Sequence, residues 1–123
     1  MINNTPVLSV KNLSIGYEQA LYSDLTFELF RGEMIGIIGA NGRGKSTLIK
    51  TLMGTLPTLQ GSITIESKSL NQWLPHQRAQ RISVVLTERV PDTYLTVEEV
   101  IALGRYPYTN WSGKFNQEDQ DIV

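Results

Sequence analysis

One stretch of the chain carries residue types in a spacing that suits the binding of phosphate. Gly39, Gly44, Lys45 and Ser46 form the pattern G-x-x-x-x-G-K-S, which is typical of a phosphate-binding loop. Glycines let the backbone curl so that successive N–H groups point at one anion, and the helix that follows aims its positive end at the same place. Lys45 can reach the β- and γ-phosphates of a nucleoside triphosphate, and the Ser46 hydroxyl can bind Mg²⁺. The pattern therefore predicts a nucleoside triphosphate site.

The segments on either side of this loop are those that a phosphate-binding loop requires. Residues 34–38 form an apolar run of strand length, and we expect this strand to be central and buried on both faces. The residues from Lys45 to about Met53 place apolar side chains on one side of a helix. Gly54 stands where glycine commonly ends a helix. The context is thus strand, loop and helix.

Three further strands are predicted by the alternation of apolar and polar residues. Residues 7–17 alternate with an interruption after Val10, which indicates a bulge or two short strands. Residues 21–30 alternate again and lead into a tight turn at 31–33. Residues 61–66 form the third alternating strand.

The second half of the chain is expected to be mostly helical. Residues 74–81 read as a short helix, and residues 82–86 as a strand of the buried type. Thr96 and Glu99 form a capping box that begins a helix, which ends at Gly104. An aromatic loop follows, over 105–113.

The last predicted helix begins at Asn116, with acidic residues in its first turn. Its apolar residues come only at Ile122 and Val123. We therefore expect the sequence to be the N-terminal part of a longer protein.

Composition narrows the classes of function. The 123 residues are 41% apolar and 19% charged, as in a soluble globular protein. The formal net charge of −1 offers no basic field for nucleic acid, so we expect no nucleic-acid partner. The sequence has no cysteine, which excludes disulfides and thiolate metal sites, and His76 alone cannot build a metal cluster.

The order of these motifs resembles the first half of an ABC transporter ATPase subunit. The resemblance rests on Tyr17, on the phosphate-binding loop with the segment before it, and on the segments G-S-I-T-I and R-I-S-V-V-L. The segment T-V-E-E-V-I-A-L-G-R-Y-P-Y is similar to the ATPases of importers for iron-siderophores, haem and cobalamin. The resemblance covers the chain from Val7 onward and implies an α/β fold. This fold is a P-loop NTPase core with an antiparallel β subdomain, at about 1–86, followed by the Q-loop region and the start of a helical subdomain, at about 87–123.

The resemblance also implies roles for individual residues. From residue type alone, Tyr17 is more commonly a packed or surface tyrosine, although its ring can stack on a purine; the resemblance assigns it to the adenine. Lys45 would stabilise the transferred phosphate, and Ser46 would bind Mg²⁺. Thr87 stands where the family usually has a glutamine near the metal, and its hydroxyl can reach Mg²⁺ through a water. The residues expected to wrap the phosphates are Gly39, Ala40, Asn41, Gly42, Arg43, Gly44, Lys45, Ser46 and Thr47.

Arg43 occupies a variable position of the loop. It can contact a phosphate or a facing subunit, although a solvated arginine is more common.

The function implied by the resemblance is that of a transport ATPase. Two subunits would form a homodimer around ATP and Mg²⁺ and would power integral-membrane permease subunits from the cytoplasmic face of the inner membrane. The loop after 86, the helix at 97–103 and the aromatic residues at 106–111 would face the permease. The signature L-S-G-G-Q, the acidic strand with the catalytic glutamate and the switch histidine do not occur in these 123 residues. We therefore expect this chain alone to bind ATP and to hydrolyse it negligibly.

Two other functions stay open at this point. One is a soluble P-loop nucleotide or small-molecule kinase, although residues 87–123 supply only Arg89 and Arg105 for an acceptor-binding lid. The other is a non-catalytic nucleotide-binding module.

Overall fold

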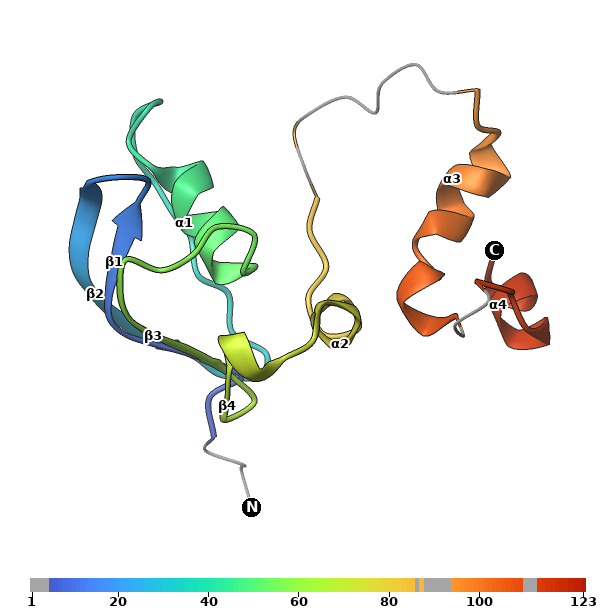
Figure 1. The fold of residues 1–123 in the computed structure, drawn as a ribbon, viewed down its shortest axis with the longest axis horizontal. Helices are drawn as coiled ribbons and strands as arrows, with labels where there is room; N and C mark the ends of the chain where they lie inside the picture. The colour runs from blue at the N-terminus through green and yellow to red at the C-terminus, as the bar shows by residue number, and fades with distance from the viewer. Residues whose placement is uncertain (1–4, 86, 88–93, 110–112) are drawn as a thin grey trace. The chain divides into compact units, whose positions relative to one another are not determined.

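The chain divides into two compact units, which we call unit 1 (Met1–Leu74) and unit 2 (Pro75–Val123). The computed structural model describes residues 5–85, 87, 94–109 and 113–123 (Figure 1). The division into subdomains near residue 86 stays a prediction.

Unit 1 is built on a four-stranded antiparallel sheet with the strand order β2-β1-β3-β4 (Figure 1). Its first three strands confirm the three alternating segments predicted from the sequence. The fourth, short strand was not predicted, because two residues carry no periodicity. The strands are β1 (Leu8–Gly16), β2 (Ala20–Leu29), β3 (Gln60–Ile65) and β4 (Lys68–Ser69).

The interruption predicted after Val10 is a β-bulge. The register of β1 shifts between Val10 and Leu13 against β2, and Asn12 has a φ of 48°. The Asn12 N–H donates to Thr26 Oγ1 at 2.9 Å, so the bulged backbone keeps a partner. On the other side of β1, a Cβ at Gly61 would lie 2.4 Å from the Asn12 carbonyl oxygen. Only glycine allows β3 to approach the bulge this closely.

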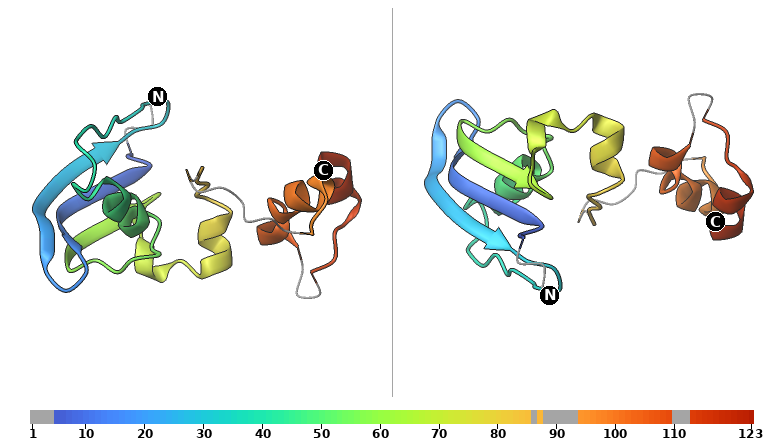
Figure 2. Two further views of the ribbon diagram at one scale, coloured as in Figure 1. Left: turned by 90° about the horizontal axis from the view of Figure 1, so that it is seen from above. Right: turned by 90° about the horizontal axis from the view of Figure 1, so that it is seen from below.

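The core of unit 1 lies between the sheet and helix α1 (Lys45–Leu52), which packs against β1 (Figure 2). The helix buries Thr47 and Thr51, and Thr51 Oγ1 donates to the Thr47 carbonyl at 2.8 Å. Among the described residues, no buried side-chain polar atom lacks a hydrogen-bond partner. Gly54, with a φ of 73°, follows the helix as predicted. The buried apolar side chains are Val10, Leu13, Ile15, Ile63, Ile65 and Leu70.

The predictions of strands at 34–38 and 82–86 are wrong for the residues that the structure describes. Residues 34–38 and 82–85 are irregular, and Leu86 lies outside the described residues. The side chains of Met34, Ile38 and Val85 are 95, 98 and 97% exposed. A strand exists only when its backbone pairs with a neighbour, and no described strand pairs with either segment. The two apolar runs therefore favour burial, but no described strand pairs with them.

Unit 2 consists of short helices. They are α2 (Pro75–Ala79), α3 (Val97–Leu103), the 3-10 helix η2 (Tyr106–Tyr108) and α4 (Gln117–Ile122). Reciprocal hydrogen bonds confirm the predicted Thr96–Glu99 capping box, and Gly104 caps the other end of α3 as predicted. Asn116 caps α4 as predicted. The Thr96 N–H and hydroxyl donate to Glu99 and hold the pKa of its carboxyl below the usual value.

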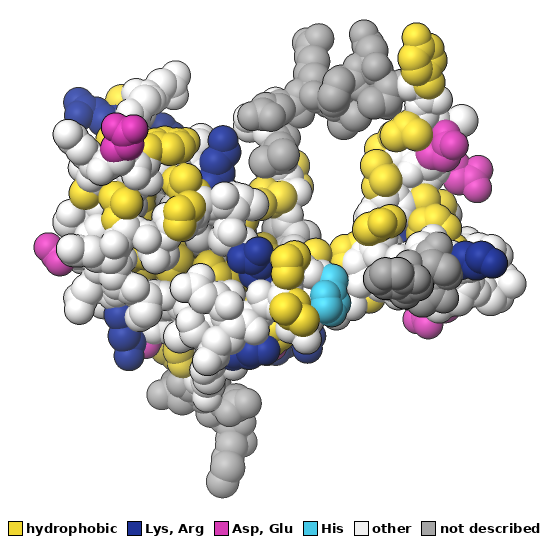
Figure 3. Space-filling model, in the orientation of Figure 1, with side chains coloured by type: hydrophobic (Ala, Val, Ile, Leu, Met, Phe, Trp, Pro, Cys, Tyr) yellow, Lys and Arg dark blue, Asp and Glu magenta, His cyan; other side chains and the backbone are white. Residues whose placement is uncertain are grey.

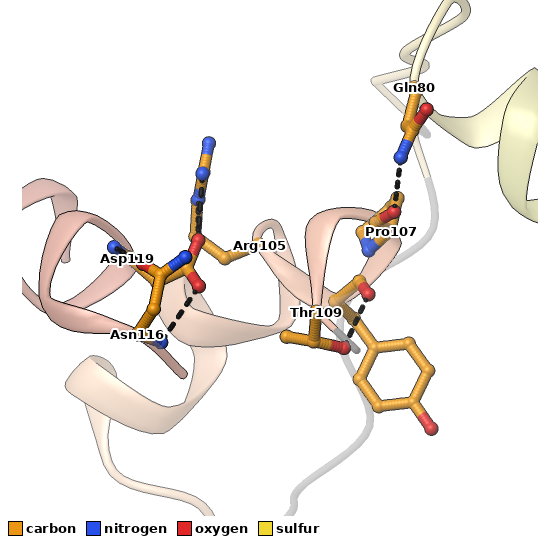
Figure 4. Close-up of polar contacts among 7 residues, drawn as sticks. Gln80, Arg105, Pro107, Thr109, Asn116 and Asp119 are labelled. Atoms are coloured by element: carbon orange, nitrogen blue, oxygen red, sulfur yellow. Dashed lines mark hydrogen bonds and ion pairs between the residues drawn. The ribbon is translucent and has the colours of Figure 1, made fainter. Parts of the chain in front are cut away.

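Asp119 is the buried side chain in the described part of unit 2, and Figure 4 shows its polar contacts. Its carboxylate accepts the Asn116 N–H at 3.0 Å and two donors of the Arg105 guanidinium at 2.9 and 2.7 Å. The hydrogen bond from Asn116 and then those from Arg105 hold the pKa of Asp119 below its usual value. Elsewhere in the unit, Gln80 Nε2 donates to the Pro107 carbonyl at 2.7 Å, which joins α2 to η2.

Candidate functional site

The loop before α1 has the curled backbone that the glycine pattern predicts. Gly42 and Gly44 have φ values of 78° and 81°, in the left-handed region that glycine adopts without strain. Gly44 is the N-cap of α1, and the Leu48 N–H donates to its carbonyl at 2.8 Å to form the first helical bond. No side chain caps this helix end. The first N–H groups of α1 are therefore left for an outside acceptor.

Lys45 folds back over the loop from the first turn of α1. Its Nζ donates to the carbonyls of Gly39 and Ala40, both at 2.7 Å. These two bonds join the first residues of the loop to its last, which fixes the curl of the backbone. An ammonium group has three donors, so one remains for a ligand.

A cleft of about 430 Å³ lies beside the loop within unit 1. Its volume is in the range of small-ligand sites. The base of the cleft comes from the sheet, from α1 and from residues 37–38, and its polar side comes from the loop. Residues lining it include Tyr22, Ile37, Gly39, Ala40, Arg43, Gly44 and Lys45.

Tyr22 lines this cleft, and the sequence analysis did not identify it. The residue lies on β2, and its ring carbons are 3.4 and 3.6 Å from the position that a Cβ on Gly44 would take. A Cβ at position 44 would be in ordinary contact with the ring, so the positive φ of Gly44, and not a lack of space, favours glycine there. The sequence offers only a weak signal for this contact, because an aromatic residue at the start of an edge strand is common.

The other predicted phosphate-binding residues lie along the same loop. Asn41, Gly42 and Ser46 are exposed, whereas Thr47 is buried against the sheet. A side chain at Gly39 would meet no atom within 4 Å, so the backbone is open to a ligand there. The residues predicted to wrap phosphate are thus adjacent in space as well as in sequence.

Tyr17 and Thr87 are not brought to the cleft by any described contact. Tyr17 is 63% exposed on the turn between β1 and β2 and does not line the cleft. Thr87 is exposed and belongs to unit 2. The roles of Tyr17 in adenine stacking and of Thr87 near the metal stay predictions.

Nucleotide phosphate fits this loop for three physical reasons. The left-handed glycines, the uncapped start of α1 and the remaining donor of Lys45 all favour an anion at one place. The described residues hold no cluster of three acidic or histidine side chains that could bind a metal. Magnesium bound with a nucleotide takes most of its ligands from phosphate and water, so a single hydroxyl such as that of Ser46 suits it.

Comparison with known proteins places the chain in a family. Residues 22–122 match the family described as ABC transporter. The chain belongs to the ABC transporter family. Its fold is accordingly that of the ABC ATPases, a P-loop α/β fold with an antiparallel sheet. A solved ATP-binding subunit of an ABC transporter superposes with a TM-score of 0.72 at 38% identity, over 83% of this chain and 42% of that one. A putative ABC transporter ATP-binding protein of Pyrococcus furiosus gives 0.68 at 25% identity, over 78% and 46%.

Curated relatives in the family include transport ATPases. An uncharacterized ABC transporter ATP-binding protein of Methanocaldococcus jannaschii is 38% identical over 95% of this chain. A hemin import ATP-binding protein of Pseudomonas fluorescens is 37% identical over 85% of this chain. A probable siderophore transport system ATP-binding protein of Bacillus subtilis is 32% identical over 94% of it. The chain covers 41, 40 and 42% of these three relatives' own lengths. Within the described residues, no helix is long and apolar enough to span a membrane.

Proposed function

We propose that this chain is a nucleotide-binding part of an ABC importer ATPase, and that it binds ATP with Mg²⁺ through the loop Gly39–Thr47. The observation that carries the proposal is the Lys45 ammonium. It is held over the loop by two carbonyls, next to a helix start that no side chain caps. Membership of the ABC transporter family supports ATP as the nucleotide.

The proposal gives separate roles to the backbone of the loop and to individual side chains. Backbone N–H groups from Gly42 to Thr47 donate to the phosphates, and Lys45 neutralises charge on the β and γ oxygens. Bound Mg²⁺, held by the Ser46 hydroxyl, supplies further charge neutralisation. Tyr17 stacks on the adenine, and Thr87 contacts the metal through water.

In the longer protein, two such subunits would form a homodimer and act with integral-membrane permeases at the cytoplasmic face of the inner membrane. Attack of water on the γ-phosphate needs a general base, which we assign to residues outside this chain. The 123 residues alone therefore bind ATP and turn it over negligibly.

The cargo that we propose is an iron chelate, haem or cobalamin. Support comes from relatives named for hemin import, siderophore transport and iron(3+)-hydroxamate import. Deleting the encoding gene is expected to lower uptake of haem or of iron-loaded siderophore, and a plasmid copy is expected to restore it. Unchanged uptake of all three cargo classes would remove the import assignment and leave ATP binding in place.

The direct test of ATP binding compares the wild type with Lys45→Ala. Loss of a charge-assisted hydrogen bond to phosphate is expected to weaken Mg-ATP binding about tenfold or more, measured by titration calorimetry. Lys50→Ala is the control, since Lys50 lies on the same helix and does not line the cleft. Equal affinity in all three proteins, or ATP turnover that Lys45→Ala abolishes, contradicts the proposal.

A further inference from the structure

Arg43 is a second cation that lines the same cleft, and its side chain has no polar or aromatic partner among the described residues. It lines the cleft together with Lys45 and the backbone of Gly39 and Ala40. Its side chain is exposed, and within the described part of the chain it forms no hydrogen bond, ion pair or ring contact. Five N–H donors of the guanidinium are therefore available to a ligand in the cleft.

Lys45 is in a different state from Arg43. Two of its three donors are already used by the loop's own carbonyls. A triphosphate presents more acceptor oxygens than one ammonium donor and the loop amides supply. Arg43, two residues earlier in the chain, adds a planar fork of donors that matches phosphate geometry.

The charge of the cleft points the same way. The described residues that line it include Arg43 and Lys45 and no acidic residue. Two cations without a carboxylate among these residues attract a polyanion, and no described acidic side chain in the lining competes for the guanidinium.

We propose that Arg43 binds the nucleotide's phosphates from within the same chain, and that it makes the site prefer nucleotides with more phosphates. The inference rests on the proposed ATP site and adds to it a determinant of selectivity. We assign its contact to the phosphates that ATP has and AMP lacks, because a second cation in the cleft gains most from the ligand with the most negative charge.

The expected effects follow from removal of one charge-assisted contact. Arg43→Ala is expected to weaken ATP binding about tenfold, ADP binding about threefold, and AMP binding not at all. Arg43→Lys keeps a point charge without the fork and is expected to lie between the wild type and alanine. Higher salt is expected to reduce the difference between wild type and Arg43→Ala, because the contact is partly in solvent.

The experiment is an NMR titration of the whole chain with Mg-ATP, Mg-ADP and AMP, which measures weak affinities as well as strong ones. Wild type, Arg43→Ala, Arg43→Lys and the control Lys50→Ala are compared at two protein concentrations. An ATP-selective loss in Arg43→Ala, partial rescue by lysine and no dependence on protein concentration support the proposal.

Three other outcomes overturn it. Equal ATP affinity in wild type and Arg43→Ala shows that the Arg43 side chain stays in solvent and does not contact the nucleotide. The proposed ATP site in the loop is unaffected by that result. An equal loss for ATP and AMP shows that the residue only shapes the loop. A loss seen only at the higher protein concentration shows that Arg43 acts on a facing copy of the chain. Absence of ATP binding by the wild type removes the proposed function as well.

Discussion

In the described part of unit 1 six apolar side chains are buried, whereas in the described part of unit 2 the one buried side chain is that of Asp119. The apolar residues of α3 are exposed instead, with Val97, Ile101 and Leu103 at 77, 50 and 58%. Figure 3 shows hydrophobic side chains, in yellow, on one side of α3 and acidic side chains, in magenta, on the other.

The two units are therefore stabilised by different interactions. The core of unit 1 is stabilised by apolar burial, which involves no ionisable side chain among its described residues. Unit 2 is held by the Arg105–Asp119 ion pair and by caps, which depend on charge. The phosphate-binding loop lies in the unit with the core, so a rigid sheet supports the site.

The largest effect is expected from the core of unit 1. Leu13 is fully buried in β1, and Leu13→Ala is expected to cost about 2–5 kcal/mol because it removes contacts and leaves a cavity. Urea unfolding followed at the β1 amides measures the loss. Ile101→Ala, at a half-exposed position of α3, is the matched control and is expected to change stability by about 0.5 kcal/mol or less. Equal costs would erase the contrast between the units.

In unit 2 the most sensitive residue is expected to be Asp119. Asp119→Ala removes the acceptor for both Asn116 and Arg105, so α4 and the segment at Arg105 are expected to lose protection from amide hydrogen exchange. Unit 1 is expected to keep its protection. Glu118→Ala, exposed on the same helix, is the control. If protection in α4 survives Asp119→Ala, the ion pair does not hold the unit together.

The same carboxylate predicts a pH dependence. The folded pKa of Asp119 is lower than its unfolded value, so its contribution is complete above the ordinary aspartate pKa of about 3.9 and is lost as the pH falls below it. The buried residues in the described part of unit 1 include no ionisable side chain, so its sheet is expected to persist to lower pH. NMR spectra recorded from pH 7 down to about pH 2 separate the two units, because Asp119 takes up its proton only below the ordinary aspartate pKa of about 3.9. Simultaneous loss of both units on acidification would contradict the prediction.

A smaller effect is expected at the turn between β3 and β4. Ser67 has a φ of 65°, in the region that favours glycine, so Ser67→Gly is expected to stabilise unit 1 by about 0.5–1 kcal/mol. Ser23→Gly, within β2 and without a positive φ, is expected to have the opposite sign. Urea midpoints of the two variants that move in the same direction would show that the turn is not strained.

Features with local causes were predictable from the sequence. The bulge after Val10, the capping box of Thr96 and the cap at Asn116 each depend on residues close in sequence, and all three are confirmed. The loop around Lys45 was predictable for the same reason, because one short motif determines both the glycine conformations and the position of the ammonium group.

Features that depend on distant partners were not predictable. The apolar run at 34–38 fits a central strand, but pairing decides whether a strand forms, and no described strand pairs with it. Tyr22 lines the cleft together with Gly44, 22 positions away in the sequence, and no local pattern indicates this.

The most direct test of ATP binding by the loop Gly39–Thr47 is an NMR titration of the wild-type chain with Mg-ATP, followed at the backbone amides. Binding by the loop predicts that the largest shifts fall on Gly39 to Thr47, that Tyr22 also shifts because it lines the same cleft, and that amides of α4 stay in place. Lys45→Ala is expected to suppress these shifts. Saturable shifts elsewhere with the loop unchanged, or no shifts at all, would contradict the assignment of Gly39–Thr47 as the ATP-binding site.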